Sequence, residues 1–131
     1  MIDQNRIVVE RYLEAWNATD ATLRAKAVAS VWDLSGIYNS SMANAKGHDD
    51  LVGLIAGFRA RFPGALFRLA GEVREHDDII SLEWEFLDPD RETLAATGRD
   101  IIVVAANGRI QAVHSTFSGV INERVTGRKR C

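Results

Sequence analysis

The sequence predicts an α+β fold in which three N-terminal helices pack on one face of a mostly antiparallel sheet. Apolar residues recur at helical spacing up to residue 62, and they alternate with polar residues from residue 66 onward. Short turns join the later strands, which indicates antiparallel pairing. Helices grouped before the strands are typical of α+β domains. At 131 residues the chain is expected to form one domain, residues 1–131.

The first two helices are predicted from amphipathic spacing and from their boundary residues. The first, residues 3–18, places apolar side chains on one face, namely Val8, Val9, Tyr12, Leu13 and Trp16. The second, residues 20–32, begins at Asp20, a favourable N-cap residue, and is ended by Ser35 and Gly36. Its apolar residues repeat at a spacing of four, at Leu23, Ala27 and Val31.

The third helix is expected to begin at Gly47 and to end before Pro63 and Gly64. Asp49 and Asp50 lie in its first turn, where negative charge is favourable. Its buried stripe is formed by Leu51, Ile55, Phe58 and Phe62. This spacing of three and four residues predicts that the helix packs along one face.

A short strand is expected at residues 36–42, between the second and third helices, with a loop after it. Four longer strands follow the third helix, at residues 66–75, 79–87, 94–105 and 109–121. Turn-forming residues separate them at 76–78, at 88–91 and at Asn107-Gly108.

Composition excludes several classes of function. The formal net charge of −2 gives no electrostatic basis for binding nucleic acid or an anionic membrane. The single cysteine, Cys131, allows no disulfide within the chain, and no Cys/His cluster indicates a metal site. There is no signal-peptide core and no apolar run of membrane-helix length, so we expect a cytoplasmic protein without metal or cofactor. Residues 123–131 are expected to form a flexible tail.

The most informative charged residue is Asp100, within the predicted strand at residues 97–104. Because side chains alternate along a strand, Asp100 shares a face with Ile102 and Val104. An ionised carboxylate on an apolar face is costly without partners, and its pKa otherwise rises. Asp100 is therefore either a hydrogen-bonded residue near the open end of the strand or an acid/base group of a functional site.

Three runs of residues carry a resemblance to a known family. They are 11–14 (RYLE) on the first helix, 46–48 (KGH) before the third, and Asp100 together with 108–111 (GRIQ). With the order of elements, they make the chain resemble the nuclear transport factor 2-like superfamily, within it the SnoaL-like polyketide cyclases and ketosteroid isomerases. The resemblance implies a cone in which a strongly curved sheet wraps three helices around a pocket. This fold hosts isomerases, cyclases, dehydratases and non-enzymes, so it selects no single reaction.

The resemblance also implies roles for two residues. In the isomerases, a helix-1 tyrosine and a neutral late-strand aspartic acid hydrogen bond a developing oxyanion, and Tyr12 and Asp100 match these positions. In SnoaL-like cyclases a comparable aspartate is an acid/base, which Asp100 resembles equally. Phe117 resembles the aromatic residue that lines the pocket from the last strand. The expected pocket residues are Trp16, Tyr38, Ser40, Phe58, Trp84, Phe86, Ile102, Val113, Ser115 and Phe117.

The chain departs from the isomerase pattern at the first strand. The isomerase base there is an aspartate, and this chain has Ser40. A serine without a neighbouring base does not abstract a carbon-bound proton at neutral pH, so steroid isomerisation is not expected. Two functions stay open. One is acid–base catalysis of isomerase, cyclase or dehydratase type on an apolar carbonyl or ring compound, and the other is non-catalytic binding of a hydrophobic ligand or a protein partner.

The face of residues 97–104 opposite Asp100 predicts a subunit contact. Ile101 and Val103 lie there, and a monomer would leave them within an exposed apolar patch. Alternation on the last strand places His114 at the same contact. Since the resemblance also implies dimers, we expect a homodimer through the outer face of the sheet and an apolar small molecule as ligand.

Overall fold

The computed structural model describes residues 3–88 and 93–119, and within them it contains three helices and seven strands. The helices are α1 (Asp3–Asn17), α2 (Ala21–Val31) and α3 (His48–Arg61). The strands are β1 (Trp32–Asn39), β2 (Asn44–Lys46), β3 (Leu66–Leu69), β4 (Arg74–His76), β5 (Ile79–Asp88), β6 (Thr93–Val104) and β7 (Ile110–Gly119). The predicted tail at residues 123–131 lies outside the described residues.

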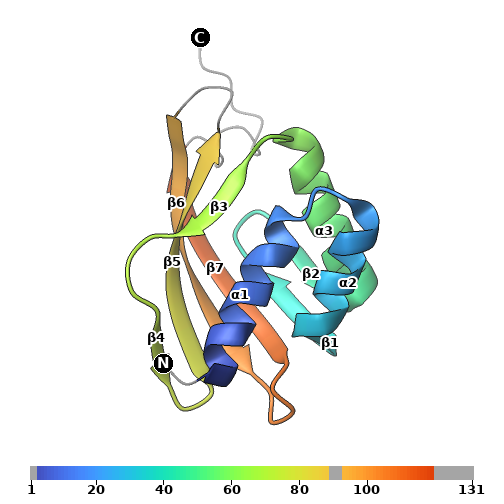
Figure 1. Cartoon of the computed structure of the whole chain (residues 1–131), viewed down its shortest axis with the longest axis vertical. Helices are drawn as coiled ribbons and strands as arrows, with labels where there is room; N and C mark the ends of the chain where they lie inside the picture. Colours follow the sequence, from blue (N-terminus) through green and yellow to red (C-terminus); the bar gives the residue numbers. More distant parts are fainter. Residues whose placement is uncertain (1–2, 89–92, 120–131) are drawn as a thin grey trace.

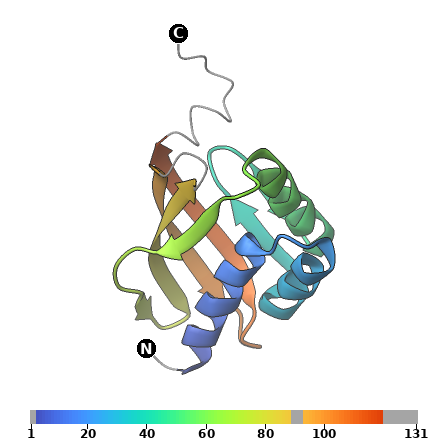
Figure 2. The same ribbon diagram turned by 45° about the horizontal axis from the view of Figure 1, so that its top comes forward.

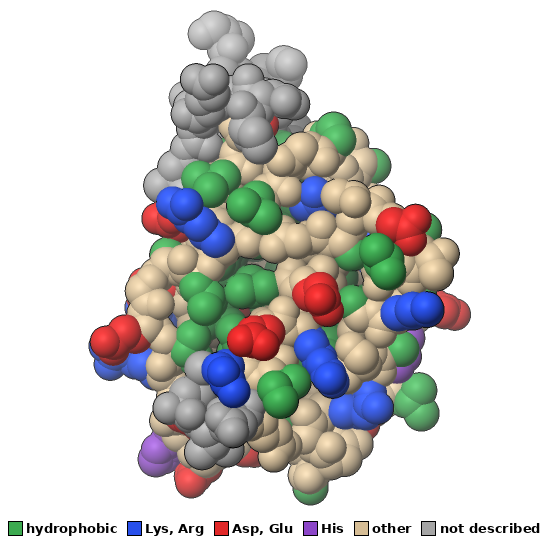
Figure 3. All heavy atoms as spheres, in the orientation of Figure 1, with side chains coloured by type: hydrophobic (Ala, Val, Ile, Leu, Met, Phe, Trp, Pro, Cys, Tyr) green, Lys and Arg blue, Asp and Glu red, His purple; other side chains and the backbone are tan. Residues whose placement is uncertain are grey.

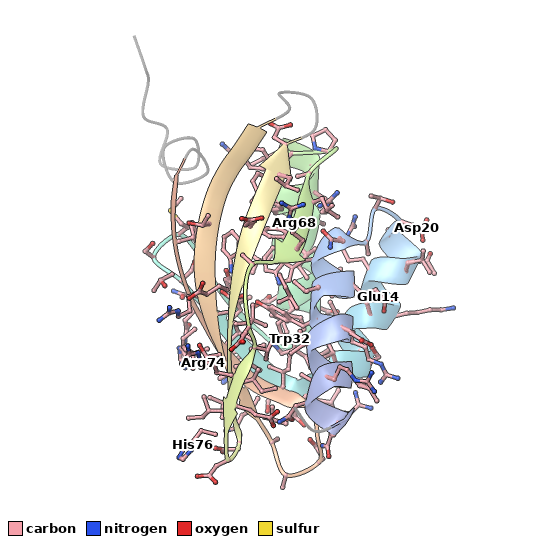
Figure 4. All side chains as sticks on the ribbon, turned by 60° about the vertical axis from the view of Figure 1, so that its left-hand side comes forward. Glu14, Asp20, Trp32, Arg68, Arg74 and His76 are labelled. Atoms are coloured by element: carbon pink, nitrogen blue, oxygen red, sulfur yellow. The ribbon has the colours of Figure 1, made fainter. Side chains whose placement is uncertain are left out.

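The strands form one mixed sheet in the order β2-β1-β7-β6-β5-β3, and β4 pairs with β5. All neighbouring pairs are antiparallel except β1 and β7, which are parallel. The three helices lie together on one side of the sheet, whose long strands curve around them (Figures 1 and 2). Figure 4 shows the two layers from the side. The predicted α+β class, with helices on one face of a mostly antiparallel sheet, is confirmed.

Residues adjacent along β6 have opposite surroundings because the strand has a helix-covered face and an outer face. Asp100 is paired in register with Leu82 on β5 and Ser115 on β7, and all three side chains are buried beneath the helices. Arg99 is exposed on the outer face, and Ile101 beside it is half-buried. The predicted alternation therefore holds along this strand.

The first strand begins earlier than predicted. The second helix ends at Val31, because the backbone N–H of Trp32 closes the last turn on the carbonyl of Val28 and Trp32 itself is extended. Gly36 does not end the helix but lies within β1, where the Trp32 ring packs so close that a Cβ at Gly36 would lie 2.5 Å from Trp32 Cδ1. A turn through Ser40 then reverses the chain into β2, a strand that was expected to be a loop.

The predicted strand at 66–75 is two shorter strands, β3 and β4. The chain turns between them at Gly71, whose φ of +104° is a conformation that favours glycine. The N–H of Ala70 still donates to the carbonyl of Glu83 on β5, so both short strands lie against one long neighbour. The alternation of apolar and polar residues cannot locate this break, because it continues from β3 into β4.

The buried face of α2 differs from the predicted one by one residue. Leu23 is 59% exposed, and the residues that face the core are Arg24, Ala27, Val28 and Val31. Arg24 turns inward because its Nη2 donates to the carbonyl of Ala18, just after α1 (3.2 Å). The N-cap was predicted correctly, since the carboxylate of Asp20 accepts from the N–H of Leu23.

The predicted apolar faces of α1 and α3 form most of the helical side of the core. Tyr12 and Val9 on α1 are almost completely buried, as are Leu51 and Ile55 on α3. Packing of these side chains against the inner face of β5, β6 and β7 fixes the helices on the sheet. None of the helices in the described part of the chain is both long and apolar enough to cross a membrane.

Candidate functional site

A cavity of about 470 Å³ lies between the inner face of the sheet and helices α1 and α3. Its lining is mostly apolar and aromatic, with a few polar groups, as is usual for small-molecule sites. The lining residues are Tyr12, Leu13, Trp16, Tyr38, Ser40, Met42, Ala43, Gly53, Leu54, Gly57, Phe58, Arg61, Phe67, Trp84, Asp100, Ser115 and Phe117. On the face of the molecule in Figure 3, basic and acidic side chains are interspersed.

Aromatic rings form one wall of the cavity. Phe67 from β3 contacts the rings of Phe58 on α3 and Trp84 on β5, with ring centres 5.1 Å apart in both pairs. Trp84 in turn contacts Phe117 on β7 at 5.9 Å. Tilted and edge-on contacts of this kind stabilise aromatic clusters beyond the burial of their area, so we expect a rigid wall.

The polar end of the cavity is organised around Asp100. One carboxylate oxygen, Oδ2, accepts a hydrogen bond from the hydroxyl of Tyr12 on α1 (2.5 Å). The other, Oδ1, accepts from the indole N–H of Trp84 on β5 (3.0 Å). Asp100 is only 3% exposed and lines the cavity. Side chains from α1 and β5 therefore fix the orientation of one buried carboxyl group on β6.

Burial is the main cause of the pKa shifts of both Asp100 and Tyr12. Loss of hydration raises the pKa of Asp100, and nearby Ser115, Tyr12 and Trp84 oppose the rise because they favour the ionised carboxylate. Burial, and after it the charge of Asp100, raises the pKa of Tyr12 well above its ordinary value. Tyr12 therefore remains protonated as a hydrogen-bond donor, while the pKa of Asp100 lies above the ordinary value for aspartate.

Gly98 makes the bond between Trp84 and Asp100 sterically possible. It is the register partner of Trp84, and the Trp84 indole lies directly over it. A Cβ at Gly98 would lie 2.2 Å from Trp84 Cζ2 and 2.7 Å from the carbonyl oxygen of Thr116. Only glycine leaves space here for an indole that reaches Asp100, two residues along the same strand.

The structure brings most of the predicted site residues to the cavity. These are Tyr12, Trp16, Tyr38, Ser40, Phe58, Trp84, Asp100, Ser115 and Phe117. Three predicted pocket residues, Phe86, Ile102 and Val113, are instead fully buried in the core and do not line the cavity. The inner face of the sheet extends beyond the cavity. A side chain can therefore point to the inner face without lining the cavity.

Several lining residues were not predicted, above all those of α3. The unpredicted residues Gly53, Leu54, Gly57 and Arg61 recur with the predicted Phe58 at intervals of one, three and four residues, so all five share one side of the helix. This spacing could have identified the face of α3 that lines the cavity. The prediction considered apolar side chains only and therefore passed over the glycines and Arg61. Phe67 was missed because no residue of the predicted strand at 66–75 was considered as pocket wall.

Ser40, the residue that the sequence resemblance matches to the isomerase base, has a structural role. Its hydroxyl donates to the carbonyl of Ala43 (3.2 Å) and accepts from the N–H groups of Met42 and Ala43 (3.1 Å each). The side chain therefore holds the turn between β1 and β2. It has no carboxylate or imidazole within these bonds to activate it, consistent with the departure from the isomerase pattern.

The histidines of the described chain lie away from this site. His48 bonds through Nε2 to the carbonyl of Trp32 (2.9 Å), His76 is exposed at the end of β4, and His114 is exposed on the outer face of β7. Among residues 3–88 and 93–119, no three His, Cys, Asp or Glu side chains gather into a possible metal site.

Comparison with known proteins supports the expected family. The model of the SnoaL-like domain matches residues 9–113. The fold is similar to a candidate isomerase of the SnoaL-like family from Agrobacterium tumefaciens, with a TM-score of 0.84 and 28% identity over 90% of this chain and 100% of that one. No curated protein matches the chain.

Two further structures share the fold at low identity. A candidate SnoaL-like polyketide cyclase from Jannaschia sp. CCS1 has a TM-score of 0.72 and 10% identity, over 88% of this chain and 85% of that one. A de novo designed protein with a curved β-sheet also has a TM-score of 0.72, with 12% identity over 97% and 95%. Because the family model covers most of the chain and includes both Tyr12 and Asp100, the protein belongs to the SnoaL-like domain family.

Proposed function

We propose that the cavity binds an apolar carbonyl or ring compound and that Asp100 transfers a proton to or from it without a cofactor. The observation that carries this proposal is the carboxyl group of Asp100, buried at the polar end of an apolar cavity and bonded to Tyr12 and Trp84. Structural ion pairs also bury carboxylates, but Asp100 accepts hydrogen bonds from two neutral donors, Tyr12 and Trp84, and pairs with no cationic side chain among the described residues. Its placement therefore favours proton transfer over structural pairing.

The direction of the pKa shift suits this role. A general acid or base works best when its pKa lies near the operating pH, and burial moves the pKa of Asp100 upward from the ordinary aspartate range. Ser115, Tyr12 and Trp84 oppose the rise, because they favour the ionised carboxylate that would act as the base. The protonated form then serves as the acid in the return step.

Tyr12 has two possible duties in such a reaction, and both need its proton. It orients Asp100 through the bond to Oδ2, and it is a donor to a negative oxygen that develops on a ligand. Its raised pKa keeps that proton in place. Donors fixed in a dry cavity stabilise developing charge strongly, because they need no reorganisation during the reaction.

Family membership and the named neighbours support a reaction of isomerase, cyclase or dehydratase type. One neighbour is described as a candidate isomerase of the SnoaL-like family, and another, from Sinorhizobium meliloti, as a candidate polyketide cyclase. The second has a TM-score of 0.67 and 10% identity, so it bears on the fold alone. Ring or chain carbonyl compounds, which lose and gain protons at carbon, fit both descriptions and the apolar cavity.

A second candidate function, non-catalytic binding of a hydrophobic ligand or a protein partner, is favoured by one specific observation. Asp100 is the only carboxylate among the described residues that line the cavity, and the Ser40 hydroxyl is engaged in a turn. A reaction that needs a separate acid and base would lack one of them. Binding without turnover is then the remaining role for the same cavity.

Deuterium exchange at carbon separates the two functions. A bicyclic ketone such as 1-tetralone is incubated with the protein in D2O, and loss of the proton next to its carbonyl is followed by NMR. The proposal predicts faster exchange with wild-type protein and a loss of roughly 100-fold or more in Asp100→Asn. Arg99→Gln, on the outer face of the same strand, is the matched control and should keep the wild-type rate. Ketone binding without accelerated exchange would favour the non-catalytic function.

A further inference from the structure

We propose that Asn17 is a positioning residue of the candidate site, whose side-chain amide joins the end of α1 to the edge strand β3 and thereby holds the aromatic wall against Asp100. The proposal rests on the proposed function in taking the same cavity as the site. It goes further because Asn17 does not line the cavity and acts on Asp100 only through other residues. It concerns how the site is held together, so its test does not depend on turnover.

The side chain of Asn17 makes two hydrogen bonds to the backbone of one distant residue. Its Nδ2 donates to the carbonyl oxygen of Phe67 (2.9 Å), and its Oδ1 accepts from the N–H of Phe67 (2.8 Å). A backbone N–H only donates and a carbonyl only accepts, so these partners determine the orientation of the amide. Asn17 is the last residue of α1, and Phe67 lies in β3. The amide therefore pairs with β3 as a neighbouring strand would.

On one side, β3 has no strand beside it in the described sheet. It lies at the sheet edge next to the end of α1, and its only strand partner there is β5 (Figure 2). Edge strands present backbone N–H and C=O groups that lack a strand partner. Phe67 is buried, and buried backbone groups that lose their partners destabilise the fold. Asn17 supplies both partners, so it decides where β3 lies relative to α1.

The aromatic wall depends on the position of Phe67. Its ring contacts that of Trp84, with ring centres 5.1 Å apart, and that of Trp16, with ring centres 5.5 Å apart. Trp84 in turn donates from its indole N–H to Oδ1 of Asp100 (3.0 Å). A single ring, that of Trp84, therefore connects Phe67 to the candidate reacting group. If β3 moved away from α1, the support of the Trp84 indole would be lost.

The other donor to Asp100 belongs to the same helix as Asn17. Tyr12 lies earlier on α1 and donates to Oδ2 of Asp100. One donor is thus carried by α1, and the other is supported by β3 through Phe67. Because Asn17 joins α1 to β3, it fixes the two donors of Asp100 relative to each other.

A role as a helix cap does not account for Asn17. Asparagine is common at helix ends because it tolerates a left-handed backbone conformation. Among the residues that the structure describes, however, Asp77 is the only one other than glycine with a positive φ. Capping of α1 is instead provided by an arginine, since Nη1 of Arg59 donates to the carbonyl of Trp16 (3.3 Å). The side chain of Asn17 therefore serves the contact with β3.

The test is solvent exchange of the Trp84 indole proton, followed by NMR in the ligand-free full chain. This proton exchanges only when its bond to Asp100 opens, so its rate reports on the aromatic wall. Each rate is divided by that of the slowest backbone amides of β6, which report global opening. Asn17→Leu keeps roughly the size of the side chain but removes both bonds, and Asn17→Ala removes the bulk as well. Both variants should raise this ratio about tenfold or more, given the typical net contribution of two hydrogen bonds.

Asp20→Ala is the matched control. It removes the N-cap of α2, where the carboxylate accepts from the N–H of Leu23, and it lies outside the cavity wall. It lowers the stability of the fold but should leave the exchange ratio at the wild-type value, and circular dichroism checks that every variant is folded. A wild-type ratio in both Asn17 variants would overturn the proposal. An equal rise in Asp20→Ala would overturn it too, because general loss of stability would then explain the effect.

Deuterium exchange of 1-tetralone separates this proposal from the proposed function. Asn17→Leu should lower the maximal exchange rate about tenfold and the affinity for the ketone less, because Asn17 affects the geometry of Asp100 without touching the ligand. If the wild type accelerates exchange, a raised indole ratio with an unchanged ketone rate would overturn the positioning role. A wild type without accelerated exchange would refute the proposed function, and the indole ratio would still decide whether Asn17 holds the wall against Asp100.

Discussion

Asp100 and Arg99 are neighbours on β6, yet they belong to two different chemical environments. Asp100 lies beneath the helices with Tyr12 and Trp84 as partners, at the end of an apolar cavity. Arg99 lies on the outer face, where its guanidinium pairs with Glu83 at 2.5 Å in solvent. A surface pair of this kind adds little stability, about 0–1 kcal/mol. One step along a strand thus separates a candidate reactive group from a solvated one.

A second aspartate shows that the environment sets acidity. The pKa of Asp33, which is exposed, is lowered, chiefly by a hydrogen bond from Asn107 and further by one from the backbone of Ser35. The pKa of Asp100 is raised, because burial outweighs the donors that favour its ionised form. Since both residues accept hydrogen bonds, the presence of donors does not predict the direction of the shift. The difference is access to water, because Asp33 is exposed and Asp100 is buried.

The largest expected effect concerns the outer face and the homodimer predicted from the sequence. Ile101 and Val103 are half-buried there, and Val103 is paired in register with Ile79 on β5 and Ala112 on β7. Ile101→Asp would place an unpaired charge in the proposed interface and should weaken association by about 3 kcal/mol or more. Sedimentation at micromolar protein should show dimers of the wild type and monomers of the variant. A monomeric wild type would refute the dimer and leave the account of the inner face intact.

The next largest effect is expected at Gly98, the glycine against which the Trp84 indole packs. Gly98→Val would clash with the Trp84 indole and with the carbonyl of Thr116, and should lower the free energy of unfolding by about 2–3 kcal/mol. Gly57→Ala, on α3 with no atom within 4 Å of the added Cβ, should raise it by about 0.5–1 kcal/mol. Urea unfolding measures both. Similar stabilities for the two variants would show that Trp84 is not held over Gly98.

A smaller effect is expected on ligand binding at Asp100. Asp100→Leu removes the polar group and should weaken phenol binding by about 1–3 kcal/mol, whereas Asp100→Asn keeps a donor and should weaken it only modestly. We also expect no useful ketosteroid isomerisation by the wild type, because the sequence resemblance matches Ser40, and no carboxylate, to the position of the base. A phenol titration of all three proteins, beside a ketosteroid assay, checks both expectations. Equal phenol affinities would exclude Asp100 from the site, and steroid turnover would show that the base was misplaced.

The smallest effect is a pH dependence of stability. Because the pKa of Asp100 is higher in the folded than in the unfolded chain, the folded state binds more protons between the two values. The stability of the wild type relative to Asp100→Asn should therefore fall as pH rises above about 4, the ordinary aspartate range, and level off above the folded pKa. Asp33 has the opposite dependence but is present in both proteins, so it cancels. A difference independent of pH would contradict the raised pKa.

Alternation and helical spacing were sufficient to predict the architecture. They located α1, α3 and the three long strands β5, β6 and β7, and with them the inward position of Asp100. They failed where a single residue changes the path of the chain. Gly71 breaks one predicted strand into two, and Arg24 turns inward to reach a helix-end carbonyl in place of Leu23. Neither event changes the apolar pattern that the prediction used.

The candidate site was predictable in its elements but not in its bonds. Parity and the family resemblance together selected Tyr12 and Asp100, because each lies on an apolar face. The bond from Trp84 was not foreseen, since it depends on the space left by Gly98 across the ladder. The cavity also ends before Ile102, because its extent is set by how α1 and α3 sit on the sheet. Spacing along one strand does not contain that information.

The pKa of Asp100 in the ligand-free protein tests the central claim most directly. The carboxyl carbon of Asp100 is followed by carbon-13 NMR as a function of pH, with Asp100→Asn used to assign its signal. If Asp100 is a buried acid/base group at the polar end of the cavity, its midpoint lies clearly above the ordinary value for aspartate, about 3.9. Addition of 1-tetralone should then shift the same signal. A midpoint at or below the ordinary value would contradict the account and make Asp100 a structural carboxylate.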